Sequence, residues 1–260
     1  MKQFILGSDP DRDGRIRLEG SDYRHLVRAR RLAPGECFPA LLPGGGSVTV
    51  RVASVDSRVL VGEVFQGDPS QEGQPPDLPP IILFQALPKN EKMDLIVRQA
   101  AESGIAEIVP FTSEFSIVKT SSGSRLSRWE RIIREARQQS GSAAATAIRQ
   151  PVPMDGLFAC WEEIKAQWPG ALGLLFHHTP HTGVENKSLH GYLGEGYPEA
   201  VIIAIGPEGG FSPAEAERFV AAGFRPLTIG NTILRTETAA LYAHAAVRIL
   251  LLERASWEMT

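Results

Sequence analysis

The chain has 260 residues, 43% of them hydrophobic, which suffices for a sizeable buried core and for two domains. Its formal net charge of -3 weighs against a strongly basic nucleic-acid binder, because such proteins neutralise phosphates with Lys and Arg. The two cysteines, Cys37 and Cys160, form no metal-ligand pair or disulfide framework, and no secretory signal pattern is present, so we expect a cytoplasmic protein.

Arginines are concentrated in the first part of the chain. Between residues 12 and 31 seven arginines outnumber three acids, which indicates a phosphate-binding surface, with a solvated charged surface as the alternative. Val48–Val52 and Val59–Val64 then predict short strands of a small β-rich module. The predicted RNA contacts in this region are Arg12, Arg15, Arg24, Arg28, Arg30 and Arg31.

Residues 67–80 are rich in proline and polar residues, as is typical of a linker. We therefore expect a β-rich RNA-binding domain at residues 1–68, a linker at 69–80 and a second domain at 81–260. In the second domain apolar runs alternate with helical segments, which indicates an α/β fold with a mostly parallel sheet. The expected strands are Ile81–Leu87, Ile108–Phe111, Leu172–Phe176, Val201–Ile205 and Leu227–Ile229.

A helix expected around residues 125–137 carries an arginine at every third position beside an apolar stripe. The arginines share part of one exposed face and form either a second RNA contact or a solvated surface, with about equal weight. The arginines are Arg125, Arg128, Arg131, Arg134 and Arg137, and the stripe is Trp129, Ile132, Ile133 and Ala136.

Three histidines, His177, His178 and His181, follow the strand expected at Leu172–Phe176. No cysteine or carboxylate stands at metal-site spacing with them, so we expect no metal site. Neither a Ser-His-Asp nor a Cys-His nucleophile can be argued from spacing.

The strand expected at Val201–Ile205 ends in a glycine-bearing turn, Gly206–Gly210. Because glycine lacks a Cβ, the main chain of this turn can approach a ligand closely. Ser212, Pro213 and Glu215 predict a capping box and a helix that begins at Pro213. The turn has neither dinucleotide-motif nor P-loop spacing, so a tight turn without a ligand is an alternative of about equal weight.

A second turn, residues 229–239, precedes an apolar helix expected from about Glu237 to Leu252. It contains Arg235, Glu237 and three threonines, and such polar clusters at strand-to-helix junctions are typical of functional loops. A surface ion pair of Arg235 with Glu237 beside a Thr236 N-cap is the alternative. Since both turns follow parallel strands, they predict one ligand pocket at the carboxyl edge of the sheet. The helix is too short to span a bilayer, and its apolar surface is buried either within its own domain or against another subunit.

Several motifs along the chain occur together in one known family. They are His25-Leu26 through Arg28, Arg31 to Glu36, Ala86–Lys89, Lys92–Asp94, Arg128-Trp129, Glu135-Ala136, Gln139-Ser140, Gly206–Phe211 and, as the most specific, Ile233–Ala239. In these motifs and their order the chain resembles the bacterial 16S ribosomal RNA (uracil-N3) methyltransferases of the SPOUT superfamily. The resemblance covers nearly the whole chain.

Three segments depart from that family's pattern. Ser142–Thr146 stands where an arginine and then a Val-Pro pair are usual, and Asn231-Thr232 stands where proline or serine precedes arginine. Glu102–Gly104 reads Glu-Ser-Gly in place of Glu-Leu-Gly. These departures bear on substrate recognition more than on the fold.

The resemblance implies a SPOUT-type domain with a trefoil knot, a small N-terminal PUA- or OB-like domain, and a homodimer that completes its sites across the interface. It implies transfer of methyl from S-adenosyl-L-methionine to N3 of a uridine in 16S ribosomal RNA during ribosome biogenesis. It also implies catalytic roles for Arg235 and Glu237, with Lys89 and Arg128 as further RNA contacts. The implied cofactor-binding residues are Leu175, His177, Ile205, Gly206, Pro207, Glu208, Gly209, Gly210, Ile229, Gly230, Asn231, Ile233, Leu234, Thr236, Thr238 and Ala239.

Two other functions stay open from the sequence. One is another SPOUT reaction, such as ribose 2′-O-methylation, with the same cofactor and a different acceptor atom. The other is a catalytically silent RNA-binding assembly factor, in which Thr232 and the Ser142–Thr146 segment have weakened turnover. The exact nucleotide, the state of the RNA substrate and the proton acceptor are not identified by the sequence.

Overall fold

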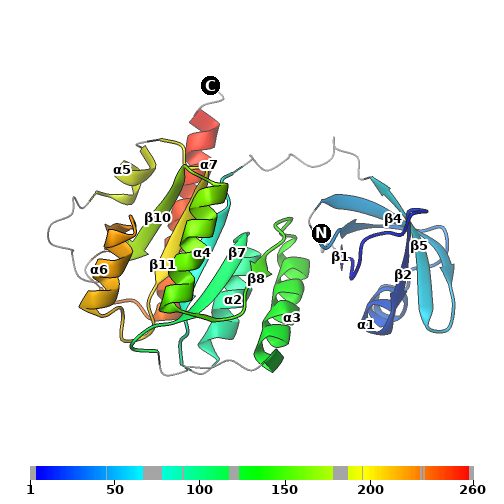
Figure 1. The fold of residues 1–260 in the computed structure, drawn as a ribbon. Coiled ribbons are helices and arrows are strands. Elements are labelled where there is room, and N and C mark those ends of the chain that lie inside the picture. Colours follow the sequence, from blue (N-terminus) through cyan, green and yellow to red (C-terminus); the bar gives the residue numbers. More distant parts are fainter. Residues whose placement is uncertain are drawn as a thin grey trace. The chain divides into compact units, whose positions relative to one another are not determined.

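The computed structural model describes residues 4–44, 46–66, 78–89, 91–116, 123–177, 187–194, 196–228, 230 and 232–257 (Figure 1). The chain divides into two compact units, Met1–Gln74 with Arg137–Ala145, and Pro75–Ala136 with Thr146–Thr260. Most of the expected linker lies outside the described residues, so the domain limits stay a prediction. In the described residues, no helix is long and apolar enough to cross a membrane.

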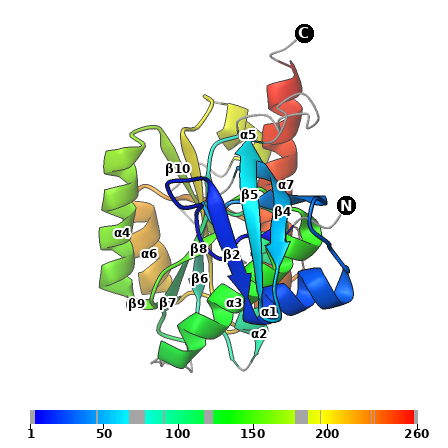
Figure 2. The same ribbon diagram turned by 90° about the vertical axis from the view of Figure 1, so that its right-hand side faces the viewer.

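The first unit is built around a five-stranded sheet in the order β1-β3-β4-β5-β2. Apart from the parallel pair β1 and β3, neighbouring strands are antiparallel, and β2, β4 and β5 can be followed in Figure 2. A short helix and a π-helix connect β2 to β3, and the two strands predicted in this module are confirmed within β4 and β5. The elements are β1 (Phe4–Ile5), β2 (Arg15–Glu19), α1 (Gly20–Tyr23), η1 (Arg24–Ala29), β3 (Cys37–Leu41), β4 (Ser47–Val55) and β5 (Val59–Gln66).

The alternation of residues along β2 explains how this unit combines a core with a charged surface. Ile16 and Leu18 are buried, whereas Arg15, Arg17 and Glu19 between them are exposed, as expected for a strand with one face on the core. These buried side chains form one apolar cluster with Leu26 of η1 and with buried side chains of the other strands.

The second unit contains a seven-stranded sheet with the path β12-β10-β11-β6-β7-β8, and β9 also pairs with β7. Every pair in it is parallel, and β6 and β11 are buried at all six positions, as is typical of strands covered on both faces. The strands are β6 (Ile81–Ala86), β7 (Glu107–Thr112), β8 (Ala147–Ile148), β9 (Val152–Pro153), β10 (Ala171–Phe176), β11 (Ala200–Ile205) and β12 (Arg225–Leu227).

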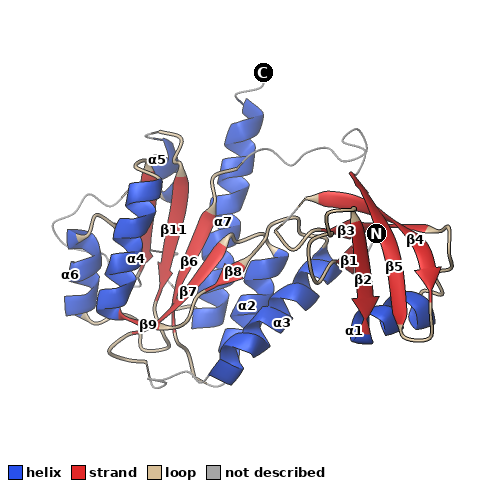
Figure 3. Cartoon of the chain, turned by 45° about the vertical axis from the view of Figure 1, so that its right-hand side comes forward, coloured by secondary structure: helices blue, strands red, loops and turns tan. Residues whose placement is uncertain are grey.

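Helices cover both faces of this sheet, as Figure 3 shows. Side chains from α2, α3, α5 and α7 form the apolar cluster on one face, and those from α4 and α6 form the cluster on the other. The bounds are α2 (Lys92–Glu102), α3 (Gly123–Ser140), α4 (Met154–Gln167), α5 (Leu189–Gly194), α6 (Pro213–Ala221) and α7 (Thr236–Trp257).

Local sequence signals place two of these helices well. The predicted capping box is present at α6, where Ser212 and Glu215 exchange side-chain and main-chain hydrogen bonds and Pro213 opens the helix. The predicted apolar stripe of α3 is buried, but the expectation that Arg137 shares the exposed arginine face is wrong. Arg137 is only 4% exposed, because it follows Ile133 by four positions and Trp129 by eight and so lies on the buried stripe of the helix.

Candidate functional site

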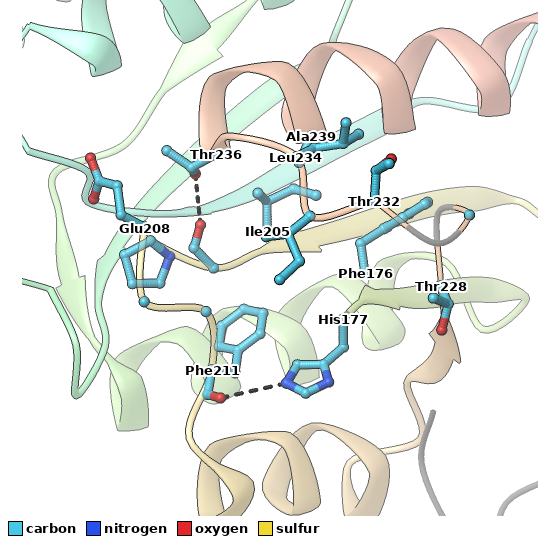
Figure 4. A pocket seen from close by; sticks show the side chains of 16 residues that line it. Phe176, His177, Ile205, Glu208, Phe211, Thr228, Thr232, Leu234, Thr236 and Ala239 are labelled. Carbon is cyan, nitrogen blue, oxygen red and sulfur yellow. Dashed lines mark hydrogen bonds between the residues drawn. The ribbon is translucent and has the colours of Figure 1, made fainter. Parts of the chain in front are cut away.

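A cavity of about 480 Å³ lies at the carboxyl ends of β10, β11 and β12. The two glycine-bearing turns and the start of α7 form its walls (Figure 4), so the predicted convergence of both turns on one pocket is present. This is the edge at which open α/β sheets bind ligands. The lining residues are Phe176, His177, Ile205, Gly206, Pro207, Glu208, Gly209, Gly210, Phe211, Thr228, Gly230, Thr232, Ile233, Leu234, Thr236 and Ala239.

The first wall is the sharp turn that follows β11. A Cβ on Gly206 would lie 3.0 Å from the carbonyl carbon of Gly210, so the turn folds back on itself more closely than a side chain permits. Gly210 has a φ of +71°, which favours glycine, and its N–H donates to the carbonyl of Pro207. The turn then leads directly into the cap of α6, which fixes it at both ends.

The opposite wall runs from Thr228 to the first turn of α7. At its end the hydroxyl of Thr236 donates a 2.7 Å hydrogen bond to the carbonyl of Gly206, so the second wall is tied to the first (Figure 4). Leu234 and Ala239 contribute apolar side chains to this wall, and Gly230 has a φ of +60°. The pocket is therefore mostly apolar side chain and glycine main chain.

The end of β10 supplies the third side of the pocket. His177 lies across the cavity from the start of α7 in Figure 4, and its Nε2 is 3.5 Å from the carbonyl oxygen of Phe211. The two rings are stacked, with centroids 6.4 Å apart. The main-chain N–H of His177 donates to Leu227, so β12 helps to hold this residue in place.

A charged group made by Lys92, Glu208 and Glu237 stands beside the pocket. The Lys92 ammonium lies 2.9 Å from Glu208 Oε1 and 3.5 Å from Glu237 Oε2, and thereby links a residue of each turn to α2. Burial acts to raise the pKa of Glu208, but hydrogen bonds from Lys92 and from the main-chain N–H of Lys89 outweigh it, so this pKa is lowered. The hydrogen bond to Glu208 raises the pKa of Lys92.

Most residues that the sequence assigned to the cofactor line this pocket. Leu175 does not, because it points to the α4 and α6 side of the sheet and is fully buried there, and Thr238 is exposed outside the lining. Ile229 and Asn231 lie outside the described residues. The assigned residues that line the pocket are His177, Ile205, Gly206, Pro207, Glu208, Gly209, Gly210, Gly230, Ile233, Leu234, Thr236 and Ala239.

Four lining residues were missed from the sequence: Phe176, Phe211, Thr228 and Thr232. Phe176 ends the expected strand Leu172–Phe176, and that position is a signal that could have identified it. Thr228 lies within the expected strand Leu227–Ile229, whereas β12 ends one residue before it. Phe211 closes the glycine turn, and Thr232 was treated only as a departure from the family pattern.

The two residues assigned to catalysis lie next to the pocket and not in its lining. Arg235 is exposed and forms no ion pair within the described residues, whereas Glu237 is half-buried and pairs with Lys92. The alternative ion pair of Arg235 with Glu237 is therefore not the arrangement found.

The residues predicted to contact RNA differ in their surroundings. The six N-terminal arginines predicted to contact RNA, which do not include Arg17, are all exposed, and among these six only Arg15 forms an ion pair, 3.9 Å from Glu63, within the part of the chain described. Arg128 of α3 pairs with Asp94 and Glu91, and the Lys89 main chain bonds Glu208. The guanidinium groups of these N-terminal arginines are thus less engaged in ion pairs than that of Arg128.

The described residues contain no cluster of three side chains able to hold a metal ion. His178 and His181, which the sequence placed after β10, are not among the residues described.

Comparisons with known proteins agree with this architecture. A sequence model described as an RNA methyltransferase domain matches residues 76–248. The ribosomal RNA small subunit methyltransferase E of Synechocystis is 30% identical over 251 residues, which are 96% of this chain and 78% of that protein. The protein of the same name from Aquifex aeolicus is 29% identical and covers 90% of this chain and 94% of its own length.

Two solved methyltransferase structures have a similar fold over nearly the whole chain. The ribosomal RNA small subunit methyltransferase E from Neisseria gonorrhoeae, bound to S-adenosyl methionine, matches with a TM-score of 0.77 at 26% identity, over 96% of this chain and 98% of that one. A Legionella pneumophila protein in complex with the same cofactor matches with a TM-score of 0.74 at 26% identity, over 96% and 98% of the two chains. The predicted α/β fold with a β-rich N-terminal domain is confirmed, and the trefoil knot stays a prediction. The chain belongs to the RNA methyltransferase family that includes the ribosomal RNA small subunit methyltransferase E proteins.

Proposed function

We propose that this protein transfers a methyl group from S-adenosylmethionine to N3 of a uridine in 16S ribosomal RNA. The observation that carries the proposal is the single pocket that both glycine-bearing turns form at the carboxyl edge of the sheet. The names of the relatives and the cofactor in the Neisseria protein support it. The uridine N3 position is taken from the family that the sequence resembles.

The pocket suits an adenosine-containing donor in size and chemistry. Its volume of about 480 Å³ falls within the range of small-molecule sites, and Ile205, Leu234 and Ala239 offer apolar surface to a flat base. The glycine turns leave main-chain groups accessible for the polar parts of the ligand. We assign donor binding to the lining residues and to the neighbouring Ile229 and Asn231.

The reaction moves a methyl group and a proton. S-adenosylmethionine supplies an electrophilic methyl on sulfur, which N3 takes as the carbon–sulfur bond breaks. The protein has to orient the two reactants, exclude water and help the weakly acidic N3–H lose its proton. Arg235, exposed beside the pocket, would orient the uracil and stabilise negative charge on its oxygens as the proton leaves. Glu237 would orient Arg235 or accept the proton, and within the described residues its carboxylate pairs with Lys92.

The N-terminal domain would hold the RNA. N3 lies on the Watson–Crick edge, so the target uridine has to be unpaired or flipped before it meets the donor. The exposed arginines from Arg12 to Arg31 are suited to phosphates near such an unpaired segment, with Lys89 and Arg128 as further contacts. We assign residues 1–68 to this RNA-binding role and residues 81–260 to the chemistry, with 69–80 as the linker.

The surface of α7 supports a homodimer. Leu241, Tyr242 and Ile249 are exposed on this helix, with Tyr242 at 59%, although its other side packs into the core of the unit. Exposed apolar side chains in such number on one helix are typical of a protein interface. We propose that a second copy of the chain covers them and that the enzyme works in the cytoplasm.

The test is transfer of isotopically labelled methyl from S-adenosylmethionine to unmodified small-subunit RNA, free and in assembled particles. Mass spectrometry of the digested nucleosides then identifies the product. Labelled 3-methyluridine supports donor, acceptor and reaction together. A labelled 2′-O-methyl nucleoside rejects the N3 assignment, and intact donor binding with no transfer to either substrate rejects this reaction in favour of a silent factor or another RNA.

A further inference from the structure

A tight turn after β7 holds an aromatic side chain out to solvent beside the pocket. Ser113–Ser116 forms this turn, and Phe115 at its tip is 45% exposed. Most large apolar side chains of this unit are buried in its two clusters, so the position of Phe115 calls for a physical reason.

The turn is rigid because its ends are bonded to each other. Ser116 N–H donates to the carbonyl of Ser113 at 3.0 Å, and Ser113 N–H donates to the hydroxyl of Ser116 at 3.1 Å. Both serines are buried, so water does not compete strongly for these bonds. The backbone of Phe115 is therefore fixed, although its ring is exposed.

The turn is also fastened to the cap of α6. Glu215 Oε1 accepts a 2.8 Å hydrogen bond from the N–H of Glu114, and its Oε2 accepts one from the N–H of Ser212. Glu215 is buried, so this one carboxylate joins the β7 turn to the end of the first glycine turn. The two turns keep a fixed geometry relative to each other.

Phe115 packs directly on the glycine turn. A Cβ built on Gly209 would lie 3.0 Å from Phe115 Cβ and 3.3 Å from its Cγ. Gly209 lines the pocket, so Phe115 lies directly beside a residue of the cavity wall, although its ring is not part of the lining. Ile233 of the second glycine-bearing turn lines the pocket and is 81% exposed, so it adds exposed apolar surface at the cavity.

We propose that Phe115 is a stacking platform for the unpaired acceptor base of the RNA. This inference rests on the proposed function, because a base that leaves its helix loses its stacking partners and gains from a flat apolar surface. Loss of one aromatic stacking partner weakens binding of a nucleic acid by about ten- to a hundredfold. Because the hydrogen bonds of the Ser113–Ser116 turn restrain the backbone that carries the ring, little ordering of the main chain is needed for this contact. Phe115 positions the acceptor, and the donor is held by other residues.

The experiment compares Phe115→Ala, Phe115→Leu and Phe115→Tyr with Tyr197→Ala, an exposed aromatic of the same unit, as the matched control. Methyl transfer to RNA, RNA affinity with S-adenosylhomocysteine present, donor affinity by calorimetry and molar mass in solution are measured for each. We expect the Ala and Leu variants to lose about ten- to a hundredfold in kcat/KM for RNA. The Tyr variant and the control should stay within about twofold of the original chain, and donor affinity should not change.

The proposal is overturned if the Leu variant matches the original chain, if donor affinity falls as much as RNA activity, or if the Ala variant dissociates a dimer. The last outcome would make Phe115 an interface between two copies. Failure of the proposed function is a separate result, because it changes the methylated nucleoside or abolishes transfer in the original chain. In that case RNA affinity still shows whether an aromatic ring at position 115 is required.

Discussion

The hydroxyl of Thr236 donates a hydrogen bond of 2.7 Å to the carbonyl of Gly206 and so joins the first residue of α7 to the turn after β11. Behind it, Gln85 Nε2 lies 3.1 Å from Thr236 Oγ1 and 2.9 Å from the carbonyl of Ala86. A carbonyl only accepts, so Gln85 must be the donor to Thr236, and the Thr236 proton is left for Gly206. Gln85 is fully buried in an otherwise apolar strand, and its Oε1 has no hydrogen-bond partner among the described residues. A buried amide oxygen without a partner destabilises the folded state, so a glutamine at this strand position indicates that its hydrogen bond to Thr236 helps to form the pocket.

Replacing Thr236 by Val should weaken donor binding by roughly tenfold, because it keeps the shape, leaves the Gly206 carbonyl without the Thr236 hydroxyl and removes one of the two acceptors of the Gln85 amide. Thr236→Ser keeps the hydroxyl and should stay close to the original affinity. Calorimetry with S-adenosylmethionine measures the difference. Equal affinities of the Val and Ser variants would show that the hydrogen bond does not position the turn.

Gly206→Ala should also weaken donor binding, by roughly tenfold or more, through crowding of the main chain. The new Cβ would lie 3.0 Å from the Gly210 carbonyl carbon and 3.3 Å from the Phe211 nitrogen, and backbone atoms cannot rotate away. Gly194→Ala is the control, because apart from its chain neighbours and its own helix backbone no atom lies within 4 Å of the added Cβ. The measurement is the donor affinity of both variants, with melting temperatures to confirm that each variant folds. Unchanged affinity in the Gly206 variant would argue against the pocket as the donor site.

Glu237→Gln tests the role of the carboxylate next to Arg235. Loss of a general base costs about a hundredfold to ten-thousandfold in rate, whereas loss of an orienting charge costs less. Because Lys92 holds Glu237 outside the pocket lining, we expect kcat to fall less than about tenfold, while Arg235→Ala lowers kcat about a hundredfold. Single-turnover rates across pH measure both. A thousandfold loss with a missing pH limb in the Gln variant would assign the proton transfer to Glu237.

The parts of the site that the sequence predicted are those with local signals. Ser212, Pro213 and Glu215 lie within four residues, so the cap of α6 could be recognised without the fold. The contact of Lys89 with Glu208 joins residues 119 positions apart, and the turn that presents Phe115 is fastened by Glu215 across 101 positions. Such contacts depend on which strands are neighbours in the sheet. The hydrophobic periodicity of the sequence does not predict this strand order. The face to which Leu175 or Phe176 points depends on the same register.

Stability should fall as the solution becomes acidic, because of the histidine buried in α7. Burial, together with the nearby Arg248, lowers the pKa of His244 from 6.5 to about 4, and its Nε2 lies 2.8 Å from Ser103 Oγ. The unfolded chain therefore binds a proton between pH 6.5 and 4 that the folded chain does not. Protonation of His244 therefore lowers the free energy of unfolding by at most about 3 kcal/mol as the pH falls through this range. Above this range His244 contributes no pH dependence.

Denaturant titrations from pH 7.5 to 4.5 measure this dependence. His244→Gln should remove the part of the slope due to this side chain, whereas His190→Gln, at an exposed position of α5, should retain it. An identical slope in the His244 variant and the original chain would assign the acid sensitivity to other groups.

Arg28→Ala should weaken RNA binding and make it less dependent on salt. Arg28 is exposed on η1 and forms no ion pair in the described part of the chain, so its charge is available to a phosphate. Each lost phosphate contact lowers the slope of log affinity against log salt by about 0.7 to 0.9. Arg51→Ala is the control, because Arg51 is paired with Glu63 at 2.6 Å in the same unit and should contribute little. Filter binding from low to physiological salt gives the slopes. Equal changes for both variants would indicate that net charge alone attracts the RNA, and an unchanged slope for the Arg28 variant would exclude a phosphate contact at this position.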